Sequence, residues 1–381
     1  MMLLKSKLPK VGTTIFTVMS QLAVQYSAIN LSQGFPDYDS PPELISLVDK
    51  YMKEGYNQYA PMAGLMKLRE RIAEKQLLLH QSDYNPDTEI TITAGGTQAI
   101  FTALACVIRP GDEVIIFEPA YDSYAPTVTL LGGVVKPVEL SPPRYAINWN
   151  EVKDLLSPRT RMIMINSPNN PTGITLSDED MQELLSLTKN TEILILSDEV
   201  YEHLIYDGKQ HLSVSRYPGL KERSFITVSF GKLFHTTGWK VGYCLTPEWL
   251  MTEFRKVHQF LVFSVNTPVQ YAIADFLGNA ENYSGLNNFF QVKKDFFSNL
   301  LKDTRFDLLP CFGSYFQSVQ YTRISDEKDT DLAKRLITEF GVASIPVSAF
   351  YGNGTDHRVL RFCFAKKQET LEKAVDRLSG V

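Results

Sequence analysis

The sequence predicts an α/β protein whose larger part is a mostly parallel sheet covered by helices on both faces. Between residues 89 and 246, short apolar runs typical of buried strands alternate with helical stretches, as they do in sheets built from strand–helix–strand units. The chain has 381 residues, of which 44% are hydrophobic and 21% charged. This is an ordinary globular composition, and the length suffices for one large domain and a smaller one.

An N-terminal arm, a short strand and two helices are expected before the sheet. In residues 13–26, apolar side chains recur at helical spacing, and residues 30–37 form a short strand that enters a Gly/Pro turn. Gly34 either makes this turn or lets a ligand approach the backbone. A helix is expected to begin at 40–43 (SPPE), with capping by serine and an acid in its first turn. A second helix is expected over 65–79.

Seven strands are expected in the large sheet, most of them separated by helices. Their ranges are 89–93, 113–117, 134–138, 162–165, 192–196, 225–228 and 242–245. The clearest helices between them cover 97–108 and 178–189. Polar or glycine-rich motifs follow several of these strands. Ligands of open α/β sheets bind at the carboxyl ends of the strands, so these motifs are the candidate site.

The C-terminal part predicts a second, α+β unit. After residue 245, the expected helices are 247–261, 268–276, 283–302 and 331–340, and the expected strands are 314–320, 342–345 and 359–364. Chain termini commonly lie close together in a compact unit, so the N-terminal segment is expected to complete this one. The predicted division is 41–280 for the large domain, and 1–40 together with 281–381 for the small domain.

Charge and composition argue against several classes of function. The net charge is -5 and charges alternate in sign along the chain, which argues against nucleic acid or an anionic membrane as partner. The four cysteines form no Cys-x-x-Cys pair, which fits free thiols in a reducing compartment. The histidines form no His-x-x-x-His pair, so no metal centre is expected. No apolar run has the length of a membrane span or a signal-peptide core, and we expect a cytoplasmic protein.

Two lysines follow the predicted strand 225–228. Lys232 ends the motif SFGK, and Lys240 lies eight residues further on, in GWKVG. A lysine at the carboxyl end of a strand can bind an aldehyde cofactor covalently through its amine. The second lysine could then bind the phosphate of that cofactor. Two surface lysines around a glycine-rich turn are the alternative.

Two other strands are followed by glycine or proline motifs. In AGGT at 94–97, backbone N–H groups and a helix N-terminus would form a phosphate cradle, although a strand-to-helix turn needs glycine in any case. In SPNNPTG at 167–173, the prolines exclude helix and strand. They make a rigid loop that would direct asparagine side chains at a ligand, and a plain turn is the alternative.

Charged and aromatic residues follow the remaining strands. Asp198 comes directly after an apolar run, so it is expected near the sheet edge, partly buried and in need of a partner. Tyr201 would present its hydroxyl to the same volume, but helix capping by Ser197 or Asp198 is equally compatible. Tyr121 offers an aromatic face. Arg361 lies inside an apolar strand, where its planar guanidinium suits a carboxylate.

These groups are the ones that a pyridine-aldehyde phosphate cofactor needs. Six motifs, spread from residue 33 to 365, occur together: QGFPD, NQY, PNNPTG, DEVYE, SFGK…TGWKVG and LRFCFA. In this order they resemble the class-I pyridoxal-phosphate-dependent aminotransferases, in particular the methionine aminotransferase and kynurenine aminotransferase branch. The resemblance implies the fold type I of pyridoxal-phosphate-dependent transferases and a homodimer.

The resemblance also implies a role for each position in binding pyridoxal 5'-phosphate. Lys232 would bind the aldehyde and later move the proton of the substrate α-carbon, and Asp198 would pair with the pyridine nitrogen. Tyr201 and Asn170 would bind the phenolate oxygen, and Tyr121 would stack on the ring. The phosphate would be bound by Gly95, Gly96, Thr97, Ser229 and Lys240, and by Tyr59 of the partner subunit.

The substrate side of the site is likewise implied by the resemblance. Arg361 would bind the α-carboxylate, assisted by Asn170 and the backbone at Gly34. The side-chain pocket would include Ile15 or Phe16 from the N-terminal arm, which suits large apolar or thioether side chains. The expected reaction is transfer of an amino group from methionine, an aromatic or a similar amino acid to a 2-oxo acid.

Other functions of the same cofactor remain as alternatives. One is β-elimination from cysteine conjugates, and another is transamination of kynurenine. A non-catalytic regulator is disfavoured because no DNA-binding module is present and Lys232 is intact. Many class-I enzymes have arginine where this chain has Lys240, and lysine there is typical of the kynurenine/methionine branch. No second arginine is placed to bind a side-chain carboxylate, so an aspartate specialist is not expected.

Overall fold

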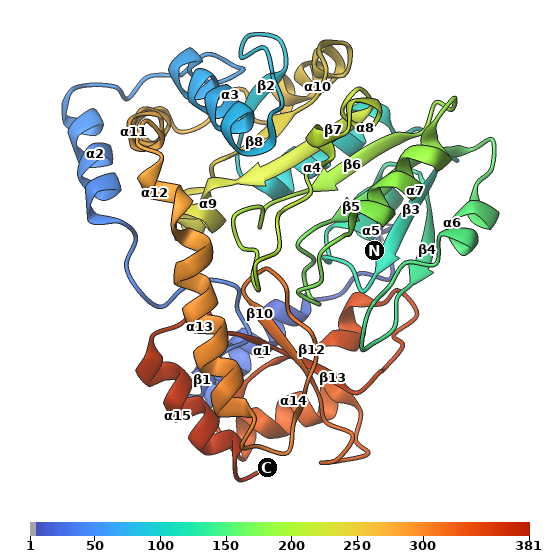
Figure 1. Ribbon diagram of the computed structural model, residues 1–381, viewed down its shortest axis with the longest axis vertical. Coiled ribbons are helices and arrows are strands. Elements are labelled where there is room, and N and C mark those ends of the chain that lie inside the picture. Colours follow the sequence, from blue (N-terminus) through green and yellow to red (C-terminus); the bar gives the residue numbers. More distant parts are fainter. Residues whose placement is uncertain (1–4) are drawn as a thin grey trace.

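The structure, a computed structural model, describes residues 5–381 and has two regions of regular structure (Figure 1). A seven-stranded sheet with its helices forms the upper region in that view, and two smaller sheets with their helices form the lower one. Residues 1–4, which begin the predicted N-terminal arm, lie outside the described part. None of the helices in residues 5–381 is long and apolar enough to cross a membrane.

The large sheet confirms the predicted α/β class. Its strands are β2 (Ile90–Thr93), β3 (Glu113–Glu118), β4 (Val134–Glu139), β5 (Thr160–Asn166), β6 (Leu194–Asp198), β7 (Ser224–Ser229) and β8 (Gly242–Leu245). Their order is β2-β8-β7-β6-β5-β3-β4. Strand β8 is antiparallel to both neighbours, and the other pairs are parallel. All seven predicted strands are present, but β6 begins and ends later than predicted, so that it includes Asp198.

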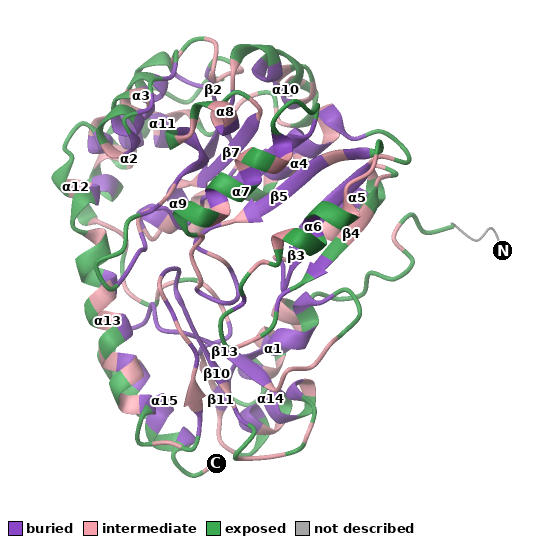
Figure 2. Ribbon diagram, turned by 45° about the vertical axis from the view of Figure 1, so that its right-hand side comes forward, coloured by how far each residue is buried: buried purple, intermediate pink, exposed green. Residues whose placement is uncertain are grey.

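Both faces of this sheet are buried, which explains why its strands are apolar without alternation. Along β3, Val114 and Ile116 belong to one core while Ile115 and Phe117 belong to the other. Figure 2 shows these strands largely buried and the outer faces of the covering helices exposed. The helices of this region are α2 (Pro42–Lys53), α3 (Met66–His80), α4 (Gly96–Val107), α5 (Tyr124–Leu130), α6 (Trp149–Leu155), α7 (Asp178–Thr188), α8 (Pro218–Lys221), α9 (Phe230–Leu233), α10 (Glu248–Leu261) and α11 (Thr267–Leu277).

The lower region combines both ends of the chain. It contains α1 (Ile15–Gln25), β1 (Ile29–Asn30), α13 (Leu286–Leu301), β9 (Asp307–Leu308), β10 (Phe316–Gln320), α14 (Asp329–Thr338), β11 (Val342–Ala343), β12 (Ile345–Pro346), β13 (Val359–Cys363) and α15 (Gln368–Leu378). The short helix α12 (Glu281–Ser284) precedes α13 and lies beside α11 of the upper region (Figure 1). Strand β1 pairs with β11, and an antiparallel sheet has the order β12-β13-β10-β9. The N-terminal segment therefore lies against the C-terminal unit. The domain bounds at residues 40 and 280 stay a prediction.

Several local predictions were wrong. The expected strand 342–345 is two strands in different sheets, and the expected helix 283–302 is interrupted at Gly285. Helix α15 and the short helices α5 and α6 were not predicted. Ser40 does not cap α2, whose N-cap is Pro41. Its hydroxyl lies one residue too early for that and donates instead to the backbone oxygen of His235 (2.9 Å).

The described part of the chain also has three short 3-10 segments: η1 (Val214–Arg216), η2 (Thr237–Trp239) and η3 (Val347–Phe350). Segment η2 matters for the site because it joins the loop after α9 to Lys240. Lys240 follows it in a left-handed conformation (φ 56°). The chain then turns directly into β8, which brings this lysine back to the end of the sheet where β7 terminates.

Candidate active site

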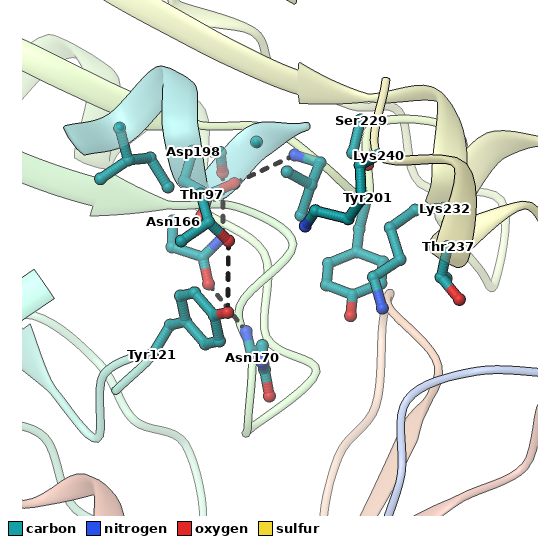
Figure 3. A pocket seen from close by; sticks show the side chains of 13 residues that line it. Thr97, Tyr121, Asn166, Asn170, Asp198, Tyr201, Ser229, Lys232, Thr237 and Lys240 are labelled. Carbon is teal, nitrogen blue, oxygen red and sulfur yellow. Dashed lines mark hydrogen bonds between the residues drawn. The ribbon is translucent and has the colours of Figure 1, made fainter. Parts of the chain in front are cut away.

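A cavity of about 190 Å³ opens at the carboxyl ends of β5, β6 and β7 (Figure 3). These strands end in Asn166, Asp198 and Ser229, and because they are parallel neighbours their last residues meet at one edge of the sheet. The wall consists of Gly96, Thr97, Ile100, Tyr121, Asn166, Asn170, Asp198, Val200, Tyr201, Ser229, Lys232, Thr237 and Lys240. Most of the predicted site residues are therefore brought together from separate strand ends.

The other predicted residues lie next to this wall or away from it. Gly34 contacts Lys232 through a hydrogen bond, Gly95 adjoins Lys240, and Arg361 is bound to Asn170 of the wall. Tyr59 is 82% exposed and is not part of the cavity of its own chain.

Asp198 is more deeply buried than predicted, because β6 extends up to it and both neighbouring strands cover it. Only 3% of the residue is exposed. Its carboxylate accepts hydrogen bonds from the hydroxyl of Tyr124 (2.5 Å) and the N–H of Val200 (3.2 Å). Burial raises the pKa of Asp198 to about 6, although these two bonds oppose the shift. Because both donors are neutral, the negative charge of the carboxylate is not compensated. A cationic donor can therefore bind to it in addition.

Lys232 lies in α9, directly after β7. Its Nζ donates to the backbone oxygen of Gly34 (2.6 Å), and its own backbone oxygen accepts from the hydroxyl of Tyr315. Loss of water contact lowers the pKa of Lys232 to about 8, and the positive charges of Arg361 and Lys240 add to this effect. About a tenth of the amine is therefore neutral at pH 7, and the neutral form is the one that attacks an aldehyde.

The turn between β2 and α4 is suited to binding an anion. Gly95 has a left-handed φ of 83°, and a Cβ atom there would lie 3.3 Å from Nζ of Lys240. Gly96, at the start of α4, also has no room for a side chain, since a Cβ atom there would lie 2.9 Å from Val200. The helix N-terminus, Lys240 and the hydroxyl-bearing residues Thr97 and Ser229 border the same space. N–H groups, a helix dipole and a cation together favour a phosphate.

Arg361 is fully buried in β13. Its Nη1 donates to Oδ1 of Asn170 (2.6 Å) and its Nη2 to the backbone oxygen of Ser32 (2.7 Å). The guanidinium lies 3.8 Å from the ring centre of Phe316 and 5.2 Å from that of Phe16. Burial lowers its pKa to about 10, so it stays charged at neutral pH. The Nε atom has no hydrogen-bond partner among residues 5–381, which leaves donor capacity for a carboxylate.

Some residues of the site were missed by sequence reasoning. Asn166 ends β5 as Asp198 ends β6, so the same strand-end argument would have found it. Tyr124 follows Tyr121 by three residues and binds Asp198, but the sequence showed only an aromatic cluster. The contact of Arg361 with Ser32 joins positions far apart in the chain, and no local signal predicts it.

The residues present fit a pyridoxal-type cofactor. One end of the cavity suits a phosphate, the buried Asp198 suits a protonated ring nitrogen, and the partly neutral Lys232 suits an aldehyde. Figure 3 shows Tyr121 and Asn166 on one side of the space between these groups and Lys232 on the other. In residues 5–381, no group of three His, Cys, Asp or Glu side chains is arranged to hold a metal ion.

Comparison with known proteins identifies the family. Residues 26–378 match the family "Aminotransferase class I and II". The chain belongs to this family. Its members depend on pyridoxal phosphate, so the predicted class, enzyme type and cofactor are confirmed.

Relatives match over nearly the whole chain. Methionine aminotransferase of Escherichia coli (strain K12) is 47% identical over 98% of this chain and 97% of that protein. Kynurenine–oxoglutarate transaminase of Dictyostelium discoideum is 32% identical, with 96% and 94% covered. The solved structure of Escherichia coli YbdL, for which a methionine aminotransferase function is identified, has a TM-score of 0.97 and 46% identity, with 100% of both chains covered. The aminotransferase therefore has the expected fold type I.

Proposed function

We propose that this aminotransferase takes the amino group of methionine, an aromatic amino acid or a similar donor and transfers it to a 2-oxo acid. The main support is the 47% identity to a methionine aminotransferase along almost the whole chain. The cavity agrees with an apolar donor, because Lys232 and Lys240 are the cations among the residues that line it. A donor with a second carboxylate would need a further buried cation.

The cofactor would be held by residues from five strand ends. Lys240, with the turn at Gly95 and Gly96, would bind the phosphate, together with Thr97 and Ser229. Asp198 would keep the ring nitrogen protonated, Tyr121 would cover one ring face, and Tyr201 and Asn170 would bind the phenolate oxygen. When bound, pyridoxal phosphate supplies an aldehyde that takes up the amino group and a ring that accepts electrons from the α-carbon.

Lys232 would attach the aldehyde at rest and act as the base during turnover. Its amine has a pKa of about 8, so it accepts and returns a proton without a large free-energy difference near neutral pH. Its contacts with Gly34 and Tyr315 restrict the segment that bears it. The proton that it moves is the one on the α-carbon of the substrate.

Arg361 would orient the substrate through its α-carboxylate. The guanidinium is already fixed by Asn170 and Ser32, so little side-chain entropy is lost when the carboxylate binds. Phe16 of α1 lies against the same guanidinium. Its ring, with Ile15 beside it in the chain, would form the apolar side of the pocket for the substrate side chain.

The enzyme is proposed to be a homodimer in which Tyr59 reaches the phosphate of the neighbouring site. Tyr59 and Phe263 are 82% and 51% exposed, yet their rings contact each other at a centroid distance of 5.3 Å. Exposed aromatic clusters of this kind commonly mark protein interfaces. We also propose a cytoplasmic location, because all four cysteines of the sequence are free thiols in the structure.

A panel of amino donors tests the substrate assignment. Methionine, phenylalanine, kynurenine, glutamine and aspartate would each be assayed with a set of 2-oxo acids. We expect the highest kcat/KM with methionine or an aromatic donor, whereas preference for aspartate would contradict the proposal. Kynurenine is the second candidate, supported by the kynurenine transaminase relative. Formation of pyruvate from a cysteine conjugate without a 2-oxo acid acceptor would instead indicate β-elimination.

A further inference from the structure

A buried ion pair lies behind the wall that Asp198 and Tyr201 contribute to the cavity. The side chains of Glu202 and Lys75 are 2% and 1% exposed, and Oε1 of Glu202 lies 2.5 Å from Nζ of Lys75 on α3. The same oxygen accepts from the hydroxyl of Tyr243 (3.2 Å). Neither Glu202 nor Lys75 lines the cavity, so the proposed reaction makes no direct use of them.

The side chains of the turn after β6 point in two directions, toward the cavity and toward the protein interior. Asp198 and Tyr201 face the cavity, while the residue after each of them is bound to protein on the opposite side. Glu199 contacts Nε2 of His211 (2.7 Å) and accepts from the N–H of Val214. Glu202 contacts Lys75, Tyr243 and Nε2 of His80 (3.3 Å). Each carboxylate therefore restrains the orientation of the cavity-facing residue that precedes it.

Tyr243 extends this restraint to the other segments of the site. It follows Gly242, whose backbone is so close to the phosphate turn that a Cβ atom would lie 3.1 Å from Cα of Gly95. The ring of Tyr243 lies 5.2 Å from that of Phe230, the first residue of α9. Glu202 is thus connected to the segments that bear Asp198, Lys232 and Lys240.

Glu202 is a charged carboxylate within this cluster. Burial alone would raise the pKa of Glu202, but the charge of Lys75 and the hydrogen bond with His80 hold it well below the usual value. Burial lowers the pKa of His203 to about 3, so this ring is neutral. Because burying an ion pair is costly and often contributes little to stability, a specific orientation is the better explanation for its presence.

We propose that Glu202, held by Lys75 and Tyr243, is a positioning residue that fixes the turn from Asp198 to Tyr201 so that both side chains face the cofactor. Glu202 acts through these two residues and does not touch the reacting atoms. The inference rests on the proposed roles of Asp198 and Tyr201 toward pyridoxal phosphate. It predicts that loss of this ion pair alters cofactor binding even where the fold is retained.

Glu202→Gln is the first test, with Glu113→Gln as the matched control. Glu113 is also a buried carboxylate in an ion pair of the same sheet (Arg159, 2.6 Å), but it begins β3 at the opposite edge. The readouts are the dissociation constant of pyridoxal phosphate from the apoenzyme, the pH midpoint of the absorption band of the bound cofactor, and Tm. We expect Glu202→Gln to weaken cofactor binding about tenfold and to shift the midpoint, whereas Glu113→Gln should lower only Tm.

The double variant Lys75→Met/Glu202→Gln separates positioning from stability. It removes both buried charges, so Tm should recover relative to Glu202→Gln. The thioether that replaces the ammonium group cannot donate a hydrogen bond to hold the turn, so the defect in cofactor binding should persist. Recovery of cofactor affinity together with Tm would overturn the inference. The same is true if Glu202→Gln leaves both cofactor readouts at the values of Glu113→Gln.

Two other variants cover the remaining outcomes. If Glu202→Gln does not fold, Tyr243→Phe removes one hydroxyl from the cluster and should give a smaller shift of the same midpoint. An unchanged midpoint there would also overturn the inference. Tyr201→Phe tests the underlying role separately: if it leaves the absorption band unchanged, the proposed role of Tyr201 fails. If only Glu202→Gln has no effect, the positioning role alone fails.

Discussion

The seven-stranded sheet has a cavity with charged residues at each end of its strands, which we call the carboxyl edge and the amino edge. The two differ in whether the charged residues have partners of opposite charge. The hollow at the amino ends of the strands is the larger, about 570 Å³ against about 190 Å³ at the carboxyl ends. At the amino ends, Glu113 is bound by Arg159 and Ser157. At the carboxyl ends, Asp198 has neutral donors and Lys232 donates to a backbone oxygen.

This difference appears in the direction of the pKa shifts. The hydrogen bond from Ser157 and the charge of Arg159 lower the pKa of Glu113 despite its burial. Burial raises the pKa of Asp198 to about 6 and lowers that of Lys232 to about 8. The protein thus stabilises the charge at one edge and destabilises both charges at the other. The larger cavity is therefore not the active site. The active site is marked by buried ionisable groups that lack a charged partner.

Replacement of Lys232 should give the largest effect. Lys232→Ala removes both the amine that attaches the cofactor and the base that moves the α-proton, so turnover should fall by about 10³-fold or more. Steady-state kinetics with the best donor measures this loss. Lys221→Ala, at a lysine of α8 that does not line the cavity, is the control and should retain activity. If Lys232→Ala keeps more than a tenth of wild-type turnover, the carboxyl edge is not the reactive one.

Parallel substitutions at the two edges sharpen the comparison. Asp198→Asn removes the negative charge opposite the ring nitrogen, so kcat should fall by about 10²-fold or more. Glu113→Gln should leave kcat unchanged and lower only the free energy of unfolding. Kinetics and denaturant unfolding of both variants distinguish these effects. Equal losses of kcat would show that the two edges do not differ as described.

Arg361→Ala tests the carboxylate contact, with Arg358→Ala as the matched control. Both arginines belong to the same stretch of chain, but Arg358 is partly exposed and pairs with Asp326 (2.6 Å). Loss of the buried guanidinium should weaken transition-state binding of the amino acid by roughly 2–5 kcal/mol, seen as lower kcat/KM, while the cofactor stays bound. An unchanged kcat/KM in Arg361→Ala would place the carboxylate elsewhere.

The rate of cofactor uptake by the apoenzyme should rise with pH. Folding lowers the pKa of Lys232 from 10.5 to about 8, so the neutral amine increases about tenfold per pH unit below that value. Asp198 is ionised above about pH 6, which acts in the same direction. Stopped-flow absorbance between pH 6 and 9 measures the rate, corrected with the reaction of pyridoxal phosphate with a free amine. A rate that still increases about tenfold per pH unit up to pH 9, with no levelling off above pH 8, would contradict the lowered pKa.

The smallest expected effect is that of Ser40→Ala. Its hydroxyl binds the backbone oxygen of His235, three residues after Lys232, and its loss should cost about 1 kcal/mol of stability. Thermal unfolding measures this change. Ser46→Ala removes a comparable bond to a backbone oxygen within α2 and should not affect cofactor uptake. If Ser40→Ala changes neither Tm nor cofactor uptake more than Ser46→Ala does, the hydrogen bond from Ser40 to His235 does not stabilise the segment that bears Lys232.

The sequence predicted the large sheet well because its strands are buried on both faces. Apolar runs such as 162–165 and 225–228 are then continuous, and they are easily separated from the polar motifs that follow. The strand 342–345 was misjudged for the opposite reason. Its residues divide between two sheets, and that division depends on pairing with β1 and β13, which are distant in the chain.

The site was predictable where one motif follows one strand, as for Lys232 and Asp198. It was not predictable where tertiary contacts decide, as for Ser32 and Phe316 around Arg361. The depth of Asp198 was underestimated because β6 continues past the apolar run, and the sequence does not show that neighbouring strands cover it. Glu202 belongs to the motif DEVYE, but the sequence did not indicate a role for it. Its partner Lys75 lies on α3, far away in the chain.

The attachment point of the cofactor tests the central claim most directly. The holoenzyme would be treated with borohydride, digested and analysed by mass spectrometry for the peptide that bears the cofactor. We predict a single reduced adduct on Lys232, accompanied by loss of the visible absorption band. An adduct on Lys240 or on another lysine, or a protein that takes up no pyridoxal phosphate, would contradict the assignment of the site to the carboxyl edge of the sheet.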